Sequence, residues 1–169
     1  GRFVPYDIGR QMNPAKATRF RENPIGHFAD TLAEFQPYLR KRVTFFGAES
    51  VGKTTATQRL DARGLAVALP EWARPYLELD SVGPEVTVAK MRTIWQGQLA
   101  QQQVVEAIAA RRNRPFIAQD TDLFSTVGYW LLKGAEFGEP EVPLGLWRDA
   151  FSHASDLYVI LAQSAAPFV

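Results

Sequence analysis

Short apolar runs alternate with longer mixed stretches along most of the chain. Four of these runs have the length and composition of buried strands, at residues 43–46, 65–69, 116–118 and 157–161. The stretches beside them are long enough for helices, which we expect over residues 52–62, 72–79, 85–112, 122–133 and 143–152. Because strands that alternate with helices form parallel sheets with both faces covered, the pattern predicts an α/β fold.

In the longest of these helices, the sequence pattern also predicts which side is buried. Pro84 lies just before it, where the first turn of a helix tolerates proline. Apolar residues then recur three or four positions apart over much of its length, at Val88, Met91, Trp95, Leu99, Val105 and Ile108. Such a stripe is typical of the face that a helix packs against a core.

Residues 1–42 lack this alternation. They are rich in proline and arginine and show no sustained period of 2 or 3.6 residues. We expect an irregular arm there, with one short helix within residues 27–39, followed by the α/β domain over residues 43–169.

Composition narrows the class of protein further. The 169 residues are enough for one core, and 46% apolar with 22% charged residues is the profile of a folded globular chain. A net charge of +1 gives no sign of attraction to nucleic acid or to a membrane surface. Cysteine is absent, which excludes disulfides and thiolate chemistry. No apolar stretch reaches the roughly 18 to 20 residues that span a bilayer. We therefore expect a cytoplasmic location.

The stretch GAESVGKT at residues 47–54 lies between the first apolar run and the first helix. It fits the phosphate-binding loop G-x-x-x-x-G-K-[ST], in which glycines let main-chain N–H groups converge on phosphate oxygens. Lys53 supplies charge for the β and γ phosphates, and the Thr54 hydroxyl is a ligand for Mg²⁺. The motif predicts that ATP and Mg²⁺ bind at Gly47, Ala48, Glu49, Ser50, Val51, Gly52, Lys53, Thr54 and Thr55.

Two carboxylates follow the third apolar run, where that strand is expected to end. In a parallel sheet this is the edge at which ligands bind. Asp120 can hold Mg²⁺ through water or accept the proton of an attacking hydroxyl. Asp122 can contact the substrate, or it can cap the helix that begins there.

A third cluster, LPEWARPY at residues 69–76, follows the second apolar run and so lies near the same edge. Glu71 can bind a sugar hydroxyl and Arg74 can clamp a phosphate. Trp72 and Tyr76 can stack on a planar ring. The alternative is a surface ion pair beside two aromatic residues that pack in the core.

Together these stretches resemble the ribosylnicotinamide kinase domain of the NadR family. The resemblance rests on FFGAESVGKTT, EWARPY and QDTDLFSTVGYW, and it covers about residues 43–165. It implies a P-loop NTPase-type parallel sheet of about five strands flanked by helices. It also implies transfer of the ATP γ-phosphate to the 5′-hydroxyl of nicotinamide riboside, which gives nicotinamide mononucleotide in NAD biosynthesis.

With this resemblance, the catalytic candidates take definite roles. Lys53 binds the β and γ phosphates, while Thr54 and Asp120 hold the metal. Glu71 faces the acceptor hydroxyl, with Asp120 as the competing general base. Arg74 neutralises charge on the transferred group.

The substrate candidates are Glu71, Trp72, Arg74, Asp122 and Tyr129, and either Trp72 or Tyr129 faces the nicotinamide ring. Two other classes of function stay open. One is a non-catalytic module that senses ATP or a pyridine nucleotide, and the other is a mechanical or nucleic-acid-dependent ATPase. The even charge and the lack of a basic stripe argue against the latter.

The arm is similar to the end of the adenylyltransferase domain that precedes the kinase in this family. Thr18, Arg21, Glu22, Asn23 and Pro24 match the family pattern, whereas Ala15, Lys16 and Ala17 replace other residues. The resemblance implies an adenylyltransferase domain upstream, possible homo-oligomers, and a kinase that continues past the final SAAPFV into an arginine-bearing lid. We therefore expect residues 43–169 to lack that lid.

Overall fold

The computed structural model describes residues 18–19, 21–79 and 85–162. Its centre is a parallel sheet with the strand order β2-β3-β1-β4. The strands are β1 (Lys41–Phe46), β2 (Ala66–Leu69), β3 (Phe116–Asp120) and β4 (Leu157–Ile160). The predicted α/β sheet is thus confirmed, with four strands among the described residues where about five were expected.

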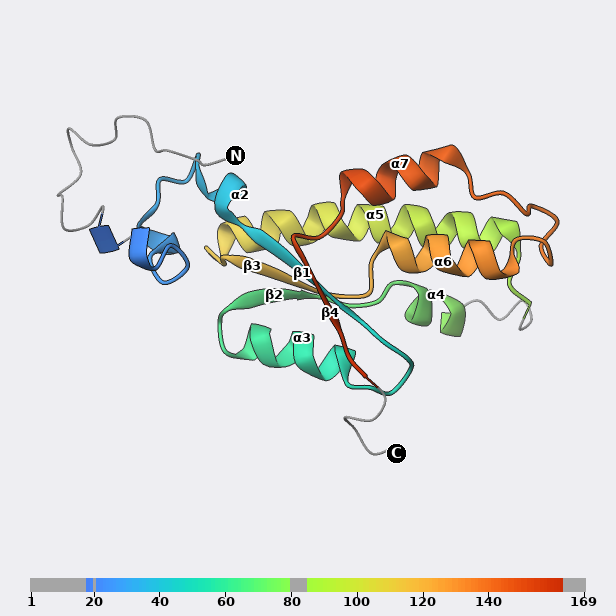
Figure 1. The fold of residues 1–169 in the computed structure, drawn as a ribbon, viewed down its shortest axis with the longest axis horizontal. Helices are drawn as coiled ribbons and strands as arrows, with labels where there is room; N and C mark the ends of the chain where they lie inside the picture. The colour runs from blue at the N-terminus through green and yellow to red at the C-terminus, as the bar shows by residue number, and fades with distance from the viewer. Residues whose placement is uncertain (1–17, 20, 80–84, 163–169) are drawn as a thin grey trace.

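Helices cover both faces of this sheet (Figure 1). α3 (Lys53–Ala62) lies on one side, and α5 (Val88–Arg111), α6 (Leu123–Lys133) and α7 (Leu144–Ser152) lie on the other. α4 (Ala73–Leu79) follows β2 and contacts α5. All five helices expected after residue 43 are present, with their ends shifted by three residues at most.

Within residues 27–39, where one short helix was expected, the structure has two short helical pieces, and this segment is anchored to the sheet. These pieces are η2 (Phe28–Asp30) and α2 (Gln36–Leu39). The buried guanidinium group of Arg40 donates from Nε to the carbonyl oxygen of Arg114 at 3.0 Å and lies over the ring of Phe28. Ala15, Lys16, Ala17 and the C-terminal SAAPFV, which carry the expectations about the arm and the lid, lie outside the described residues.

The alternation of side chains along β3 divides the core between the two faces. Ala118 packs beneath α3, where small side chains on the sheet let Ala56 and Leu60 approach it. Ile117 points to the other face and packs with Val67, Leu69, Val105 and Ala109 beneath α5. A third cluster joins α5, α6 and α7 through Met91, Ile94, Leu123, Val127, Trp130, Val142, Leu146 and Ala150.

The buried face of α5 differs from the predicted stripe. Met91 and Val105 are buried as expected, but Trp95 and Leu99 are only half-buried. The other buried positions from Met91 to the end of the helix are Ile94, Gln98, Gln102 and Ala109. The stripe was predicted from hydrophobicity, and this signal failed because two glutamines are buried with their amides in hydrogen bonds.

We expect Trp130→Ala to lower the free energy of unfolding by about 3–5 kcal/mol, because it empties a core site. Trp130 is 0% exposed, and its Nε1 donates to the carbonyl oxygen of Glu139 at 3.0 Å. Urea denaturation measures the change. Leu132→Ala is the matched control, since Leu132 lies on the same helix and is 79% exposed. Equal losses in the two variants would contradict this packing of α6.

Candidate functional site

The loop between β1 and α3 has the backbone of a phosphate-binding loop. Gly47, Ser50 and Gly52 adopt φ angles of 150°, 61° and 91°. A Cβ on Gly47 would lie 2.6 Å from the carbonyl oxygen of Leu161 and 2.9 Å from Cγ2 of Val51, so only glycine fits there. Such a loop, followed directly by a helix, presents main-chain N–H groups to an anion.

The loop itself holds the ammonium group of Lys53. Nζ donates hydrogen bonds to the carbonyl oxygens of Gly47 at 3.0 Å and Ala48 at 2.7 Å. Both acceptors belong to the phosphate-binding loop. The positive charge therefore stays at the loop, where the motif requires it.

The pairing of β1 with β3 brings the two expected metal ligands together. Phe45 is in register with Asp120, so the loop begins beside the end of β3. The Thr54 hydroxyl donates a hydrogen bond to Oδ2 of Asp120. The carboxylate of Asp120 is buried, and its Oδ1 has no partner in the part of the chain that the structure describes.

This pair of side chains fits a magnesium ion. A buried carboxylate oxygen without a partner costs free energy, and a cation offsets that cost. Hydroxyl and carboxylate oxygens are the ligands that Mg²⁺ prefers. Within the described ranges, no group of three or more His, Cys, Asp or Glu residues could hold a metal alone. A site of this kind leaves other positions on Mg²⁺ for phosphate oxygens and water.

Asp122 occupies the capping position of α6, one of its two expected roles. Its Oδ1 accepts from the N–H of Phe124 at 2.9 Å, and its Oδ2 accepts from the Tyr158 hydroxyl at 3.0 Å. Burial raises the pKa of this carboxyl, and these hydrogen bonds act in the opposite direction. Asp122 is not among the residues that line the cavity beside the loop, and its contact with a substrate stays a prediction.

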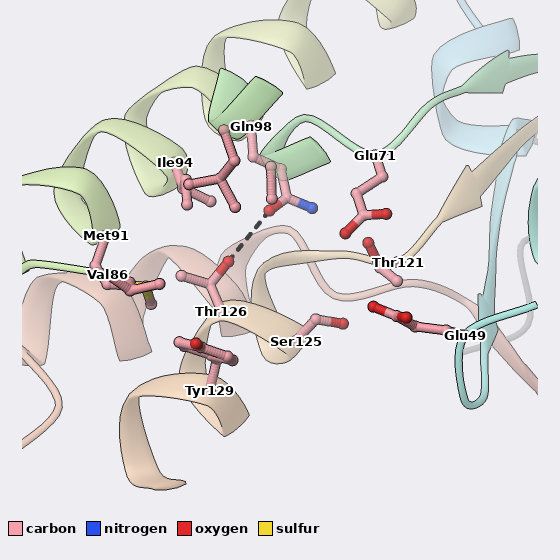
Figure 2. A pocket seen from close by; sticks show the side chains of 12 residues that line it. Glu49, Glu71, Val86, Met91, Ile94, Gln98, Thr121, Ser125, Thr126 and Tyr129 are labelled. Atoms are coloured by element: carbon pink, nitrogen blue, oxygen red, sulfur yellow. Dashed lines mark hydrogen bonds between the residues drawn. The ribbon is translucent and has the colours of Figure 1, made fainter. Parts of the chain in front are cut away.

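That cavity has a volume of about 370 Å³, which is the size of a small-molecule site (Figure 2). Figure 2 shows a carboxylate end, where Glu49 of the loop lies near Glu71 and Thr121. The opposite end is apolar and contains Val86, Met91, Ile94 and the ring of Tyr129. Gln98, Ser125 and Thr126 lie between the two ends.

Two of the predicted substrate residues line this cavity. Glu71 lies between β2 and α4, and burial together with the charge of Asp120 raises the pKa of its carboxyl. Tyr129 of α6 stacks on Phe137 with ring centroids 6.2 Å apart. The cavity is thus bordered by a carboxylate of raised pKa and by an ordered aromatic ring.

Two other predicted substrate residues do not line it. Arg74 is exposed and lies 3.7 Å from Glu71, so it contacts the site only through that carboxylate. Trp72 packs on Gly97 of α5, so closely that a Cβ there would overlap the indole. Packing was one of the two alternatives for Trp72, and its contact with the substrate ring stays a prediction.

Apart from Tyr129, sequence reasoning missed the residues in the middle and at the apolar end of the cavity. Met91, Ile94 and Gln98 share one face of α5 at spacings of three and four residues, and Ser125 and Tyr129 lie one turn apart on α6. These spacings are a detectable signal. They point to a cavity only once it is known that α5 and α6 face each other.

The parallel sheet and the loop between β1 and α3 define a P-loop nucleotide-binding module. A family model described as an AAA domain matches residues 42–168, and the chain belongs to that family. No helix in the described residues is both long enough and apolar enough to cross a bilayer.

Comparison with solved structures agrees with the resemblance seen in the sequence. Two structures of NadR protein, one in complex with NR and one with NAD and AMP-PNP, match this chain with a TM-score of 0.68 and 26% identity. The matches cover 86% of this chain and 40% and 41% of those chains, so it spans about two-fifths of their length. The inferred likeness to NadR is confirmed. Comparison with curated proteins gives no match.

We expect Asp120→Ala to weaken binding of a non-hydrolysable ATP analogue at least about tenfold when Mg²⁺ is present. The change should be small in EDTA, because the variant removes a metal ligand and leaves the phosphate-binding loop intact. Isothermal titration calorimetry with and without Mg²⁺ measures both values. Asp61→Ala, at the far end of α3, is the control. An equal loss in both buffers would contradict the assignment of Asp120 to the metal.

Proposed function

We propose that this chain transfers the γ-phosphate of ATP to the 5′-hydroxyl of nicotinamide riboside and so forms nicotinamide mononucleotide. The observation that carries the proposal is the cavity beside the phosphate-binding loop, which Glu49 of that loop lines. A hydroxyl held at this end of the cavity would lie near the last phosphate of a nucleotide on the loop. The NadR structures with NR and with AMP-PNP support the pairing of a nucleoside with an ATP analogue on this fold.

The charge of the cavity supports a cationic acceptor. Glu49 and Glu71 are the charged residues among the described residues that line it, and no Lys, Arg or His is among them. Nicotinamide riboside carries a positive pyridinium ring, whereas a nucleotide carries a negative phosphate. The two carboxylates would repel the phosphate of a nucleotide but not a nucleoside, so they favour the nucleoside as acceptor. The apolar end, with Tyr129, suits a planar ring.

Phosphoryl transfer depends on positioning and on neutralisation of charge, and the residues of the loop suit both tasks. Lys53 would exchange the carbonyl oxygens of Gly47 and Ala48 for β and γ phosphate oxygens. Thr54 and Asp120 would hold Mg²⁺, which neutralises phosphate charge when it is bound. Arg74 is exposed at the rim, near enough to Glu71 to balance charge on the product.

Glu71 is favoured over Asp120 as the partner of the acceptor hydroxyl. Asp120 is buried, accepts from Thr54 and does not line the cavity. Glu71 lines the cavity, and burial raises the pKa of its carboxyl, which suits a proton acceptor. The general base is therefore assigned to Glu71 in this proposal.

The direct test is incubation of the protein with MgATP and nicotinamide riboside, followed by separation of the products. ADP and nicotinamide mononucleotide should form in equal amounts, and neither should form when the nucleoside is omitted. Stoichiometric binding of ATP without release of ADP would reject the kinase and favour a nucleotide sensor.

We expect Lys53→Ala to lower kcat by about 100-fold or more, because it removes the charge that stabilises the transferred phosphate. The melting temperature should change little, since Nζ contacts only loop carbonyl groups. Lys133→Ala, which removes an exposed lysine from α6, is the control and should keep the wild-type rate. A Lys53→Ala enzyme with the wild-type rate would refute the role of the loop.

Glu71→Gln should lower kcat by about 100-fold while the affinity for ATP stays within about threefold, since it removes a base and leaves the loop unchanged. Steady-state kinetics and calorimetry with the ATP analogue separate the two effects. Glu78→Gln, an exposed change on α4, is the matched control. If Glu71→Gln kept the wild-type rate, Glu71 would not be the base, and Asp120 would be assigned as the partner of the acceptor hydroxyl.

A further inference from the structure

One glutamine in the wall of the cavity has only one end of its amide group satisfied. Gln98 is 6% exposed and lies on α5, facing Thr126 of α6. The Thr126 hydroxyl donates to Oε1 of Gln98 at 3.3 Å, as the dashed line in Figure 2 shows. Because the hydroxyl binds the amide oxygen, the NH₂ group of Gln98 points the other way.

That NH₂ group faces the carboxylate end of the cavity. Figure 2 shows the nitrogen turned away from Thr126, in the direction of Glu71 and Thr121. Gln98 is one of the residues that line the cavity. Within residues 18–19, 21–79 and 85–162, the nitrogen has no hydrogen-bond acceptor. Because Gln98 lines the cavity, this unpaired donor is available to a ligand or to water there.

The next turn of α5 carries a second glutamine, Gln102, whose NH₂ group is bound inside the protein while its Oε1 has no partner among the described residues. Nε2 of Gln102 donates to Oε1 of Gln119 at 3.1 Å. Gln119 in turn donates to the hydroxyl groups of Thr44 at 3.0 Å and Ser155 at 2.9 Å. Gln102 does not line the cavity. The two glutamines therefore differ in role, and only the NH₂ of Gln98 is left for a ligand.

The position of Gln98 indicates which part of a nucleoside it meets. A 5′-hydroxyl belongs at the carboxylate end near the loop, and a planar base belongs at the apolar end. Gln98 lies between these ends, beside the place of the sugar ring (Figure 2). A secondary hydroxyl of ribose has lone pairs that can accept from the NH₂ group.

From this geometry we propose that Gln98 is a specificity-determining residue, which donates a hydrogen bond to a ribose hydroxyl and so selects ribonucleosides over deoxyribonucleosides. Thr126 is the positioning residue, because its hydroxyl fixes the direction of the amide. The inference rests on the proposed function, since it takes the cavity to be the acceptor site. A site built to bind a hydroxyl rejects the analogue that lacks it, because its own buried donor is left unpaired.

The test compares nicotinamide riboside with its 2′-deoxy and 3′-deoxy forms. Wild-type protein should prefer the riboside over one of them by about tenfold or more in kcat/KM. Gln98→Met should lose about tenfold for the riboside and stay within about threefold for that deoxy form, so the preference disappears. Thr126→Val, which keeps the shape but lets the amide rotate, should reduce the preference part of the way.

Gln103→Met makes the same chemical change on the exposed side of α5 and should leave the preference intact. Thermal denaturation confirms that each variant is folded. Equal discrimination in wild type and Gln98→Met, or no discrimination against either deoxy form in wild type, would overturn the inference. So would a loss for Gln98→Met that is the same for all three nucleosides, which would indicate packing alone.

Calorimetry with the same nucleosides, in the presence of an ATP analogue, separates this inference from the proposed function. Binding that prefers the riboside through Gln98, without phosphoryl transfer, would reject the kinase and keep the specificity. Transfer to all three nucleosides at similar rates would keep the kinase and reject the specificity. Failure of the riboside to bind protein that binds the ATP analogue would reject both.

Discussion

The parallel pairing of β1 with β3 fixes the geometry on which the site depends. With Phe45 opposite Asp120, the phosphate-binding loop and the buried carboxylate meet at one edge of the sheet. A shift of one residue would exchange the faces of Gln119 and Asp120 and deprive Thr54 of its partner. Hydrogen bonds from Gln119 of β3 to Thr44 of β1 and to Ser155 before β4 oppose such a shift, because they tie β3 to β1 and to the segment beyond it.

The cavity has an apolar end and a charged end because different elements of the fold border each end. Its apolar end continues the cluster between α5 and α6, since Met91 and Ile94 belong to both. Its charged end comes from the sheet edge, where Glu49 and Glu71 follow β1 and β2. Under the proposed function, a molecule with one polar and one planar apolar end would extend the core at one side and meet the phosphate-binding loop at the other.

The sheet, the helices and the loop could be predicted because their signals are local, in apolar runs, periodicity and the spacing of Gly47, Gly52 and Lys53. The cavity could not be predicted in the same way. The position of Trp72 depends on a contact with Gly97 of a distant helix, which no local pattern in the sequence indicates. Gln98 carries no apolar signal, and its importance depends on Thr126, which lies 28 positions away along the chain.

The two internal hydrogen bonds of Lys53 have a consequence for how nucleotides exchange. A ligand must displace the carbonyl groups of Gly47 and Ala48 before it gains the ammonium group, so only the difference between old and new bonds favours binding. A long polyphosphate, which reaches Lys53 and several loop N–H groups together, overcomes this competition better than a short one. In the proposed reaction, the same carbonyl groups would bind the lysine again after a phosphate has left, and this would favour release of the product nucleotide.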